Sequence, residues 1–159
     1  AADGDAALGW FGDPVVMRFA ATGPDDSVTR TRARIEDYRA HQARHGFSKW
    51  LIVERSSGTS IGDAGPMSLP ELGVELGFRL AREWWGRGLA TEAASAWVRA
   101  AFDEHHLTGL AAFSHPENAA AHRVLAKLGF RPGGRRVVLG MDSLLFRLDA
   151  PVMARTASS

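Results

Sequence analysis

The segment WWGRGLATE at Trp84–Glu92 is the most informative stretch of this sequence. It places Gly86 and Gly88 between a strand-like segment that ends at Leu80 and an alanine-rich helical segment that begins at Leu89. Glycine allows left-handed backbone conformations and close approach of a ligand to the main chain. The first N–H groups of a helix have no partner within the helix, and the helix dipole makes that end positive. The segment therefore predicts a turn that binds a phosphate group at a helix start.

The same two glycines are also compatible with a tight turn that binds nothing. Their spacing fits neither the P-loop pattern GxxxxGK[ST] nor the dinucleotide pattern GxGxxG, because Leu-Ala-Thr follows Gly88. A nucleotide-binding α/β module is therefore a weaker interpretation than a site for another phosphate-bearing ligand.

The segments on both sides of this turn have clear periodicity. Gly73–Leu80 alternates, with apolar side chains at the even positions and Glu75 and Arg79 at odd ones, which predicts a strand with one buried face. Residues 89–105 place alanine, tryptophan and phenylalanine on one broad face, which predicts a largely buried helix. The turn therefore lies between a strand and a helix, in the position that ligand-binding loops occupy in α/β folds.

Turn residues and apolar periodicity predict the remaining elements. We expect a helix over residues 27–45, a hairpin over 49–55 and 60–65, a strand over 107–114, a helix from 116–118 to 129, and strands over 135–141 and 142–148. This order predicts one α/β (α+β) domain over residues 1–150, with a flexible tail over 151–159. Three layers are expected: a mixed, mostly antiparallel sheet with a central parallel strand pair, and helices on both faces.

Composition narrows the class of protein. A chain of 159 residues with 45% hydrophobic and 23% charged residues is typical of one globular domain. The formal net charge of +1 creates no strong attraction to nucleic acid or to a membrane surface. The chain has no cysteine, which excludes disulfides and thiolate chemistry and agrees with a reducing compartment. We therefore expect a cytoplasmic protein with a small ligand, and with neither nucleic-acid nor membrane partners.

Two charged features have ordinary explanations. His105 and His106 have no cysteine or carboxylate at ligand spacing, so we expect no metal site. Five arginines crowd the helix over residues 27–45, but acidic residues are interleaved, which favours a solvated face over a nucleic-acid surface. These arginines are Arg30, Arg32, Arg34, Arg39 and Arg44.

A second segment, HPENAAAHRVLAKLGF at His115–Phe130, follows the next predicted strand. With Trp85-x-x-Gly88-x-Ala90, it resembles the GNAT acetyltransferase superfamily, whose acyl-coenzyme A loop reads [QR]-x-x-G-x-[GA]. Trp85 departs from that pattern at its first letter. This aromatic residue, the preceding Glu-Leu-Gly-Phe and the segment DPVVMRF at Asp13–Phe19 resemble the ribosomal-protein N-terminal (alanine) acetyltransferase branch. The resemblance extends over about residues 13–148.

The resemblance implies acetyl-coenzyme A (acetyl-CoA) as acyl donor, bound between two splayed parallel strands. The backbone of the first strand would bond the pantetheine arm, and the glycine turn would enclose the pyrophosphate. The implied cofactor-binding residues are Phe78, Leu80, Trp85, Gly86, Arg87, Gly88, Leu89, Ala90, Thr91, Asn118 and Arg123. Asn118 is equally suited to be a helix N-cap, and Arg123 with Lys127 is equally suited to a solvated face.

Acetyl transfer to an amine requires a base, and Glu75 is the candidate that the family layout implies. The alternative role for Glu75 is an ion pair with Arg79 on the same strand face. Strand rise separates these two residues by about 13 Å, which argues against a direct pair.

The usual acid of the family is absent, because Ala121 and Leu125 replace the serine and tyrosine found there in many members. Ser114 is then the expected polar group at the cleft. Other candidates, each also explained as a structural or surface residue, are His115, His122 and Tyr38. The thiolate can also leave without an acid.

The resemblance thus implies an N-acetyltransferase that moves acetyl directly to a primary amine, either a protein N-terminus or a small molecule. The alternative is a non-catalytic acyl-CoA sensor, which the missing hydroxyls favour. The family's opening strand is trimmed or absent, since no β-rich run precedes Asp13. Its absence would expose an edge of the hairpin that includes residues 49–55, so a homodimer is expected through that edge.

Overall fold

A six-stranded sheet in the order β1-β2-β3-β4-β6-β5 runs through the structure, a computed structural model that describes residues 2–152. The strands are β1 (Trp50–Val53), β2 (Ser60–Leu69), β3 (Gly73–Leu80), β4 (Gly109–Ser114), β5 (Arg131–Val138) and β6 (Met141–Asp149). β3 and β4 pair in parallel, and the other neighbouring strands pair antiparallel. The predicted mixed, mostly antiparallel sheet is therefore confirmed.

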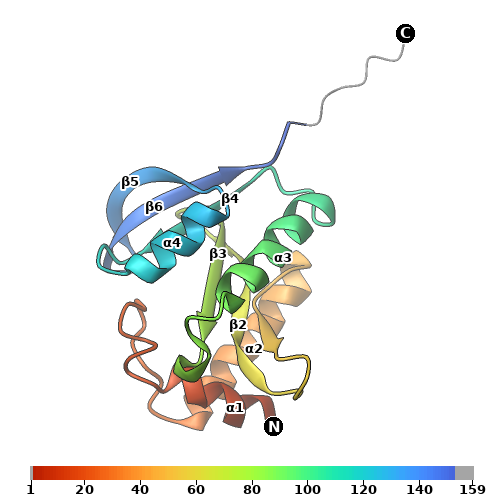
Figure 1. The fold of residues 1–159 in the computed structure, drawn as a ribbon, viewed down its shortest axis with the longest axis vertical. Coiled ribbons are helices and arrows are strands. Elements are labelled where there is room, and N and C mark those ends of the chain that lie inside the picture. Colours follow the sequence, from red (N-terminus) through yellow and green to blue (C-terminus); the bar gives the residue numbers. More distant parts are fainter. Residues whose placement is uncertain (1, 153–159) are drawn as a thin grey trace.

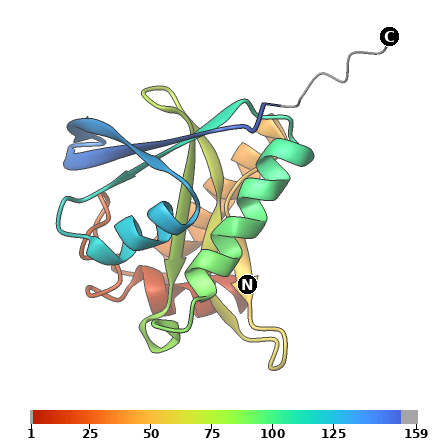
Figure 2. The ribbon, with the colours of Figure 1, turned by 45° about the horizontal axis from the view of Figure 1, so that its top comes forward.

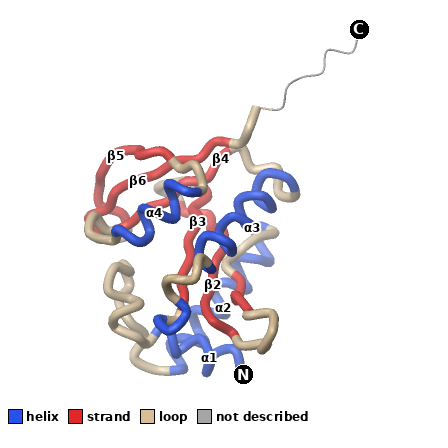
Figure 3. The backbone as a smooth tube through the Cα atoms, viewed as in Figure 1, coloured by secondary structure: helices blue, strands red, loops and turns tan. Residues whose placement is uncertain are grey.

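Helices cover both faces of this sheet, as Figures 1 and 3 show. They are α1 (Ala2–Phe11), α2 (Val28–His45), the short 3-10 helix η1 (Arg82–Trp84), α3 (Leu89–Asp103) and α4 (Ala119–Lys127). On one face, Leu76 of β3 packs in a core with Ala94 of α3 and Leu125 of α4. On the other face, Trp10 and Phe11 of α1 pack with side chains of α2 and β1. The predicted three-layer arrangement is confirmed.

Local signals explain the bounds of α2. Ser27 is its N-cap, and the Ser27 hydroxyl accepts a hydrogen bond from the Arg30 backbone N–H at 3.3 Å. At the other end, Gly46 adopts a left-handed φ of 79° and donates its N–H to the Gln42 carbonyl. This pairing of a serine cap with a C-terminal glycine is why the helix could be predicted.

Strand bounds were predicted less well. β2 extends to Leu69 rather than ending at Gly65, although Pro66 lies inside it. Pairing between β1 and β2 ends at Ala64, so Pro66 lies beyond β1, where its missing N–H costs no ladder bond. The final hairpin was also misplaced, because β5 begins at Arg131 and the turn is at residues 139–140. A register shift between Pro132 and Arg135 accommodates the Pro-Gly-Gly sequence within β5.

The start of the chain forms α1, which the sequence did not reveal as a helix. Residues 2–49 contain α1, α2 and the loop between them, and no strand is present among these residues. β1 pairs with β2 and is one edge of the sheet. Pro151 and Val152 form no helix or strand, and the rest of the predicted tail, residues 153–159, lies outside the described residues. Among residues 2–152, no helix is long and apolar enough to cross a bilayer.

The sheet opens between its two parallel strands. One bridge, Glu75 opposite Ala111, joins β3 and β4 in the described structure. Figure 2 shows β4, β5 and β6 turning away from the direction of β2 and β3. The main-chain edge of β3 beyond Glu75 is therefore left without a neighbouring strand.

Candidate functional site

A cleft of about 950 Å³ lies where β3 and β4 separate. Its walls come from both strands, from the glycine turn and the start of α3, from α4, and from the loop between α1 and α2. That loop is drawn in tan in Figure 3. Phe19 in this loop stacks on His115 at 4.9 Å between ring centroids, which ties the loop to the end of β4.

The open edge of β3 carries main-chain groups directed into the cleft. The Ala81 N–H bonds to the Ile61 carbonyl of β2 at 2.8 Å, so alternation directs the peptide groups of Phe78 and Leu80 to the β4 side. The Trp85 indole N–H already bonds to the Leu80 carbonyl at 2.9 Å. The expectation of free groups at both residues therefore needs correction, because in this structure the Leu80 carbonyl has a partner.

The glycine turn owes its shape to backbone conformation. Gly86 and Gly88 have φ angles of 73° and 74°, in the left-handed region. A Cβ built at either position meets no atom within 4 Å, so crowding does not explain these glycines. Gly88 is the N-cap of α3, which leaves the N–H groups of the first turn, Leu89–Thr91, without partners inside the helix. This cradle of backbone donors fits a phosphate group.

Arg87 differs from the expectation. Its side chain is exposed, its guanidinium donates to the Glu83 carbonyl at 3.0 Å, and it lies over the Trp84 ring at 4.8 Å. Of the described residues that line the cleft, Trp84, Trp85, Gly86 and Gly88 belong to this turn, and Arg87 is not among them. The structure thus gives Arg87 a role in holding the turn.

Helix α4 forms the opposite wall. Asn118 accepts a hydrogen bond from the Ala121 N–H at 3.2 Å, which confirms its N-cap role, and it also lines the cleft. Arg123 and Lys127 are exposed and line the same wall. Leu125 is 2% exposed and belongs to the core, so a tyrosine at this position would have to repack the interior.

Glu75 lies at the point where the strands part, and it is 6% exposed. Its carboxylate pairs with the Lys49 ammonium at 3.9 Å between Oε2 and Nζ, a partner that sequence analysis did not find. No periodic signal points to Lys49, which precedes β1. Arg79 instead pairs with Asp63 of β2 at 3.8 Å, in agreement with the argument against a Glu75–Arg79 pair.

The other polar candidates are only partly brought together. Ser114 ends β4, is 5% exposed and lines the cleft, and its hydroxyl makes one long bond of 3.5 Å to the His115 carbonyl. Tyr38 of α2 also lines the cleft. His115 and His122 are absent from the described lining residues, and His122 packs against Phe146 at 5.4 Å.

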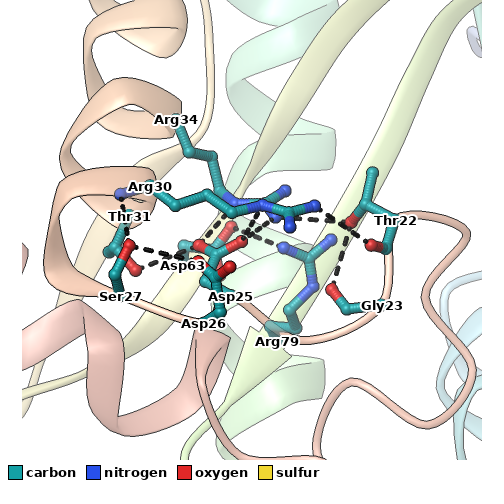
Figure 4. A network of polar contacts seen from close by, with 10 residues as sticks. All are labelled: Thr22, Gly23, Asp25, Asp26, Ser27, Arg30, Thr31, Arg34, Asp63 and Arg79. Atoms are coloured by element: carbon teal, nitrogen blue, oxygen red, sulfur yellow. Dashed lines mark hydrogen bonds and ion pairs between the residues drawn. The ribbon is translucent and has the colours of Figure 1, made fainter.

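A buried ionic network supports the side of the cleft that faces α2, and Figure 4 shows its members converging from the α1–α2 loop, α2, β2 and β3. Arg34 binds both oxygens of Asp25, with distances of 2.7 and 3.2 Å, and Thr31 donates its hydroxyl to the same carboxylate. Burial opposes ionisation of Asp25, but these bonds and the charges of Arg34 and Arg30 outweigh it and lower the pKa. The predicted solvated arginine face is therefore wrong for Arg34.

Arg79 belongs to the same network. Burial opposes its charge, but Asp63, Tyr38 and Glu75 outweigh burial and raise the pKa of the Arg79 guanidinium above its ordinary value. This side of the cleft consequently keeps fixed positive charge around Glu75. Within the described residues, no group of three His, Cys, Asp or Glu side chains is arranged to hold a metal ion.

Known proteins are similar to this chain in sequence and in fold. The family model described as "Acetyltransferase (GNAT) domain" matches residues 1–131. The uncharacterized protein YkkB of Bacillus subtilis is 32% identical over 122 residues, which span 75% of this chain and 70% of that protein. An acetyltransferase structure from Agrobacterium tumefaciens superposes with a TM-score of 0.81 at 26% identity, covering 92% of this chain and 85% of that one.

Two other solved structures share the fold at lower identity. Salmonella typhimurium YncA, titled as a complex with its cofactor acetyl-CoA, has a TM-score of 0.76 at 21% identity, with 99% of this chain and 94% of that chain covered. The ribosomal-protein-S5-alanine acetyltransferase of Vibrio fischeri has a TM-score of 0.72 at 19% identity, with 93% and 88% covered. The match to the family model over most of the chain agrees with the glycine turn beside a parted strand pair, and the chain belongs to the GNAT family of acetyl-CoA-dependent acetyltransferases.

Proposed function

We propose that this protein transfers acetyl directly from acetyl-CoA to a primary amine, with both substrates in the cleft between β3 and β4. One observation carries this proposal. The cleft adjoins a main-chain edge and a glycine turn suited to the donor, and it also contains a buried carboxylate, Glu75, where the sheet opens. Direct transfer needs donor and amine in one site, and this cleft reaches both faces of the sheet.

The donor half would be formed by backbone groups. The Phe78 peptide groups and the Leu80 N–H would bond the amides of the pantetheine arm as an added strand. The Leu89–Thr91 N–H groups would bind the pyrophosphate, since Gly86 and Gly88 leave that approach open. The Asn118 amide and the Arg123 guanidinium lie on the other wall and would contact the arm and an outer phosphate. The acetyl-CoA named in the YncA structure supports this assignment.

Glu75 would accept the proton of the amine, directly or through water. Ser114 carries a hydroxyl at the end of β4 and is proposed to assist the leaving sulfur. A thiol with a pKa near that of free cysteine, about 8.5, can also leave without an acid. Departure of the thiol without an acid would be compatible with Ala121 and Leu125, which carry no hydroxyl.

The acceptor would be a protein N-terminus or a small amine. Its side of the cleft is lined by loop residues between α1 and α2, by Tyr38, and by Leu139 and Met141 near the final hairpin turn. The Vibrio fischeri neighbour is named for a ribosomal-protein alanine, which supports testing peptides that begin with alanine.

The test is a thiol-release assay on a panel of peptides and small amines, with acetyl-CoA binding measured by calorimetry on the same protein. We expect binding with turnover on at least one class of amine. Tight binding without turnover across the panel would favour an acyl-CoA sensor and contradict the proposal. A protein that binds no acetyl-CoA would contradict the assignment of the donor half.

We also propose cytoplasmic location and a homodimer formed through β1. The absence of cysteine supports the first. The position of β1 at the sheet edge supports the second, and so does Trp50, which is 58% exposed. Sedimentation that shows only monomer at high protein concentration would contradict the dimer.

A further inference from the structure

Lysine is rare in this chain, and one of its lysines lies in the cleft. Of 19 lysine and arginine residues, two are lysines, Lys49 and Lys127. Lys127 is exposed on α4, whereas the Lys49 side chain is 10% exposed. Both residues line the cleft. The buried lysine is therefore a primary amine held inside a candidate acetyltransferase site.

The Lys49 amine lies beside the proposed base. Its Nζ is 3.9 Å from Glu75 Oε2, and the Glu75 side chain is itself 8% exposed. The same nitrogen lies 6.0 Å from the centre of the Tyr38 ring. Lys49 and Glu75 thus present an amine and a carboxylate to each other with little water between them.

Two glycines make this approach possible. Gly65 and Gly77 face each other across β2 and β3. A Cβ on Gly77 would stand 2.6 Å from Lys49 Nζ, and one on Gly65 would stand 2.8 Å from Lys49 Cα. Without side chains at either position, Lys49 can reach across the sheet face to Glu75.

The nearby arginines pair with carboxylates other than Glu75, so Glu75 is available to Lys49. Arg34 from α2 is bound by Asp25, and Arg79 from β3 is paired with Asp63 from β2. Tyr38 and His41 from α2 also lie near the pair: Lys49 Nζ is 6.0 Å from the centre of the Tyr38 ring, and the Lys49 charge contributes to lowering the His41 pKa. With Arg34 and Arg79 held by their own carboxylates, Glu75 is the acidic group that faces the Lys49 amine.

We propose that Lys49 is a self-acetylation site, modified by acetyl-CoA bound to the same molecule when no substrate amine is present. This proposal rests on the proposed function. Lys49 would give one proton to Glu75 and form an N–C bond to the acetyl carbon as the C–S bond breaks. Its second proton would go to the departing sulfur, and Glu75 would return to its carboxylate form by releasing its proton to water. The products are acetyl-lysine and free coenzyme A.

The modified side chain would be neutral and larger. It would lose its ion pair with Glu75 and would occupy the acceptor side of the cleft. Self-acetylation would therefore reduce activity towards added amines, which makes Lys49 a point of control by the ratio of donor to acceptor.

Mass spectrometry of the full chain incubated with acetyl-CoA tests this proposal, with Lys127 as the internal reference. Chemical acetylation favours exposed amines, so a purely chemical reaction would label Lys127 faster than Lys49. We expect Lys49 to be labelled at least tenfold faster than Lys127, at a rate per molecule that does not change with protein concentration. Labelling of Lys49 at or below the Lys127 rate, or a rate that rises with protein concentration, would overturn the proposal.

Two controls connect the label to the site. Glu75→Gln should slow labelling of Lys49 at least tenfold and leave labelling of Lys127 unchanged, and equal slowing of both sites would overturn the proposal. Protein denatured in guanidinium should lose the preference for Lys49. Acetyl-CoA binding and amine turnover without a Lys49 label would reject self-acetylation alone, whereas absence of acetyl-CoA binding would reject the proposed function.

Discussion

The two sides of the cleft are built in different ways. The proposed donor side consists of one continuous segment, from Phe78 on β3 through the glycine turn to Thr91, together with α4. The proposed acceptor side is assembled from separate segments joined by three ion pairs, Arg34 with Asp25, Lys49 with Glu75, and Arg79 with Asp63. A surface made of backbone groups can therefore be encoded locally, whereas a surface made of paired charges depends on the tertiary fold.

The comparison predicts that chemistry and donor binding can be separated by mutation. Glu75→Gln should lower turnover by about 10²- to 10⁴-fold, as expected for loss of a general base. Acetyl-CoA affinity should stay unchanged, because the Glu75 carboxylate lies outside the proposed donor side. Steady-state kinetics across pH and calorimetry check both statements, and the acidic limb of the rate profile should vanish in the variant. Glu71→Gln, in the exposed turn between β2 and β3, is the matched control.

Retained turnover with a persistent acidic limb would show that Glu75 is not the base. The two sides of the cleft would then differ only in how they bind their substrates, and not in whether they take part in proton transfer.

The second prediction concerns stability of the acceptor side. Asp25→Ala removes a fully buried carboxylate that binds Arg34 and leaves that guanidinium without its partner. We expect the free energy of unfolding to fall by about 3 kcal/mol, the order of magnitude for a broken buried pair. Asp5→Ala, which breaks an exposed pair with Arg32, should cost less than about 1 kcal/mol. Urea denaturation measures both, and equal losses would mean that the network adds no special stability.

The third prediction concerns the donor side. Gly88→Val places a branched residue at a φ of 74°, which should distort the turn and weaken acetyl-CoA binding by at least tenfold, about 1.4 kcal/mol. Gly58→Val imposes the same strain at a φ of 70° in the turn between β1 and β2 and should leave affinity unchanged. Calorimetry on the two folded variants measures their acetyl-CoA affinities. Unchanged affinity in Gly88→Val would mean that the turn is only structural.

The smallest effect is a pH dependence of stability on the α2 side. His41 is 6% exposed, its Nδ1 bonds to the Phe47 carbonyl at 2.8 Å, and its Nε2 accepts the Ser68 N–H at 2.9 Å. Burial is the main cause that lowers the His41 pKa below 6.5, against the Phe47 bond that raises it, with smaller contributions from nearby positive charge. The unfolded chain then binds more protons, so stability decreases as the pH falls through about 6.5 and below.

Replacing this histidine tests that sign. The stability advantage of wild type over His41→Gln should shrink between pH 7.5 and pH 5.5 in urea denaturation. An advantage that grows in acid would contradict the assignment of a neutral buried imidazole.

Sequence patterns predicted the local structure of the proposed donor side, because its determinants are short-range. The alternation of Gly73–Leu80, the glycine turn and the Asn118 cap each act within a few residues, and the structure has all three. The pair of Lys49 with Glu75 could not be predicted, because it depends on the register that sets Gly65 opposite Gly77. The role of Arg34 was missed because its partner Asp25 is buried by the tertiary fold, where the Asp25 N–H bonds to the Phe11 carbonyl of α1.

Errors in the strands also have physical causes. The predicted strand began at Arg135, but β5 begins at Arg131, because an irregular register accommodates Pro-Gly-Gly within a strand at the sheet edge. Helix α1 lacked a distinctive pattern, and its existence is explained by the burial of Ala7, Trp10 and Phe11 against the rest of the fold.

The single bridge between β3 and β4 has a consequence for how the domain unfolds. Strands β1–β3 and strands β4–β6 are two hydrogen-bonded groups, connected through Glu75–Ala111 and through the apolar core beneath α3 and α4. Local opening is easiest where few backbone bonds must break. A ligand that adds its own amides along β3 fastens the two groups together, so amide hydrogen exchange in β4 and β6 should slow when acetyl-CoA binds. Occupancy of the cleft would then set the lifetime of the C-terminal half of the sheet.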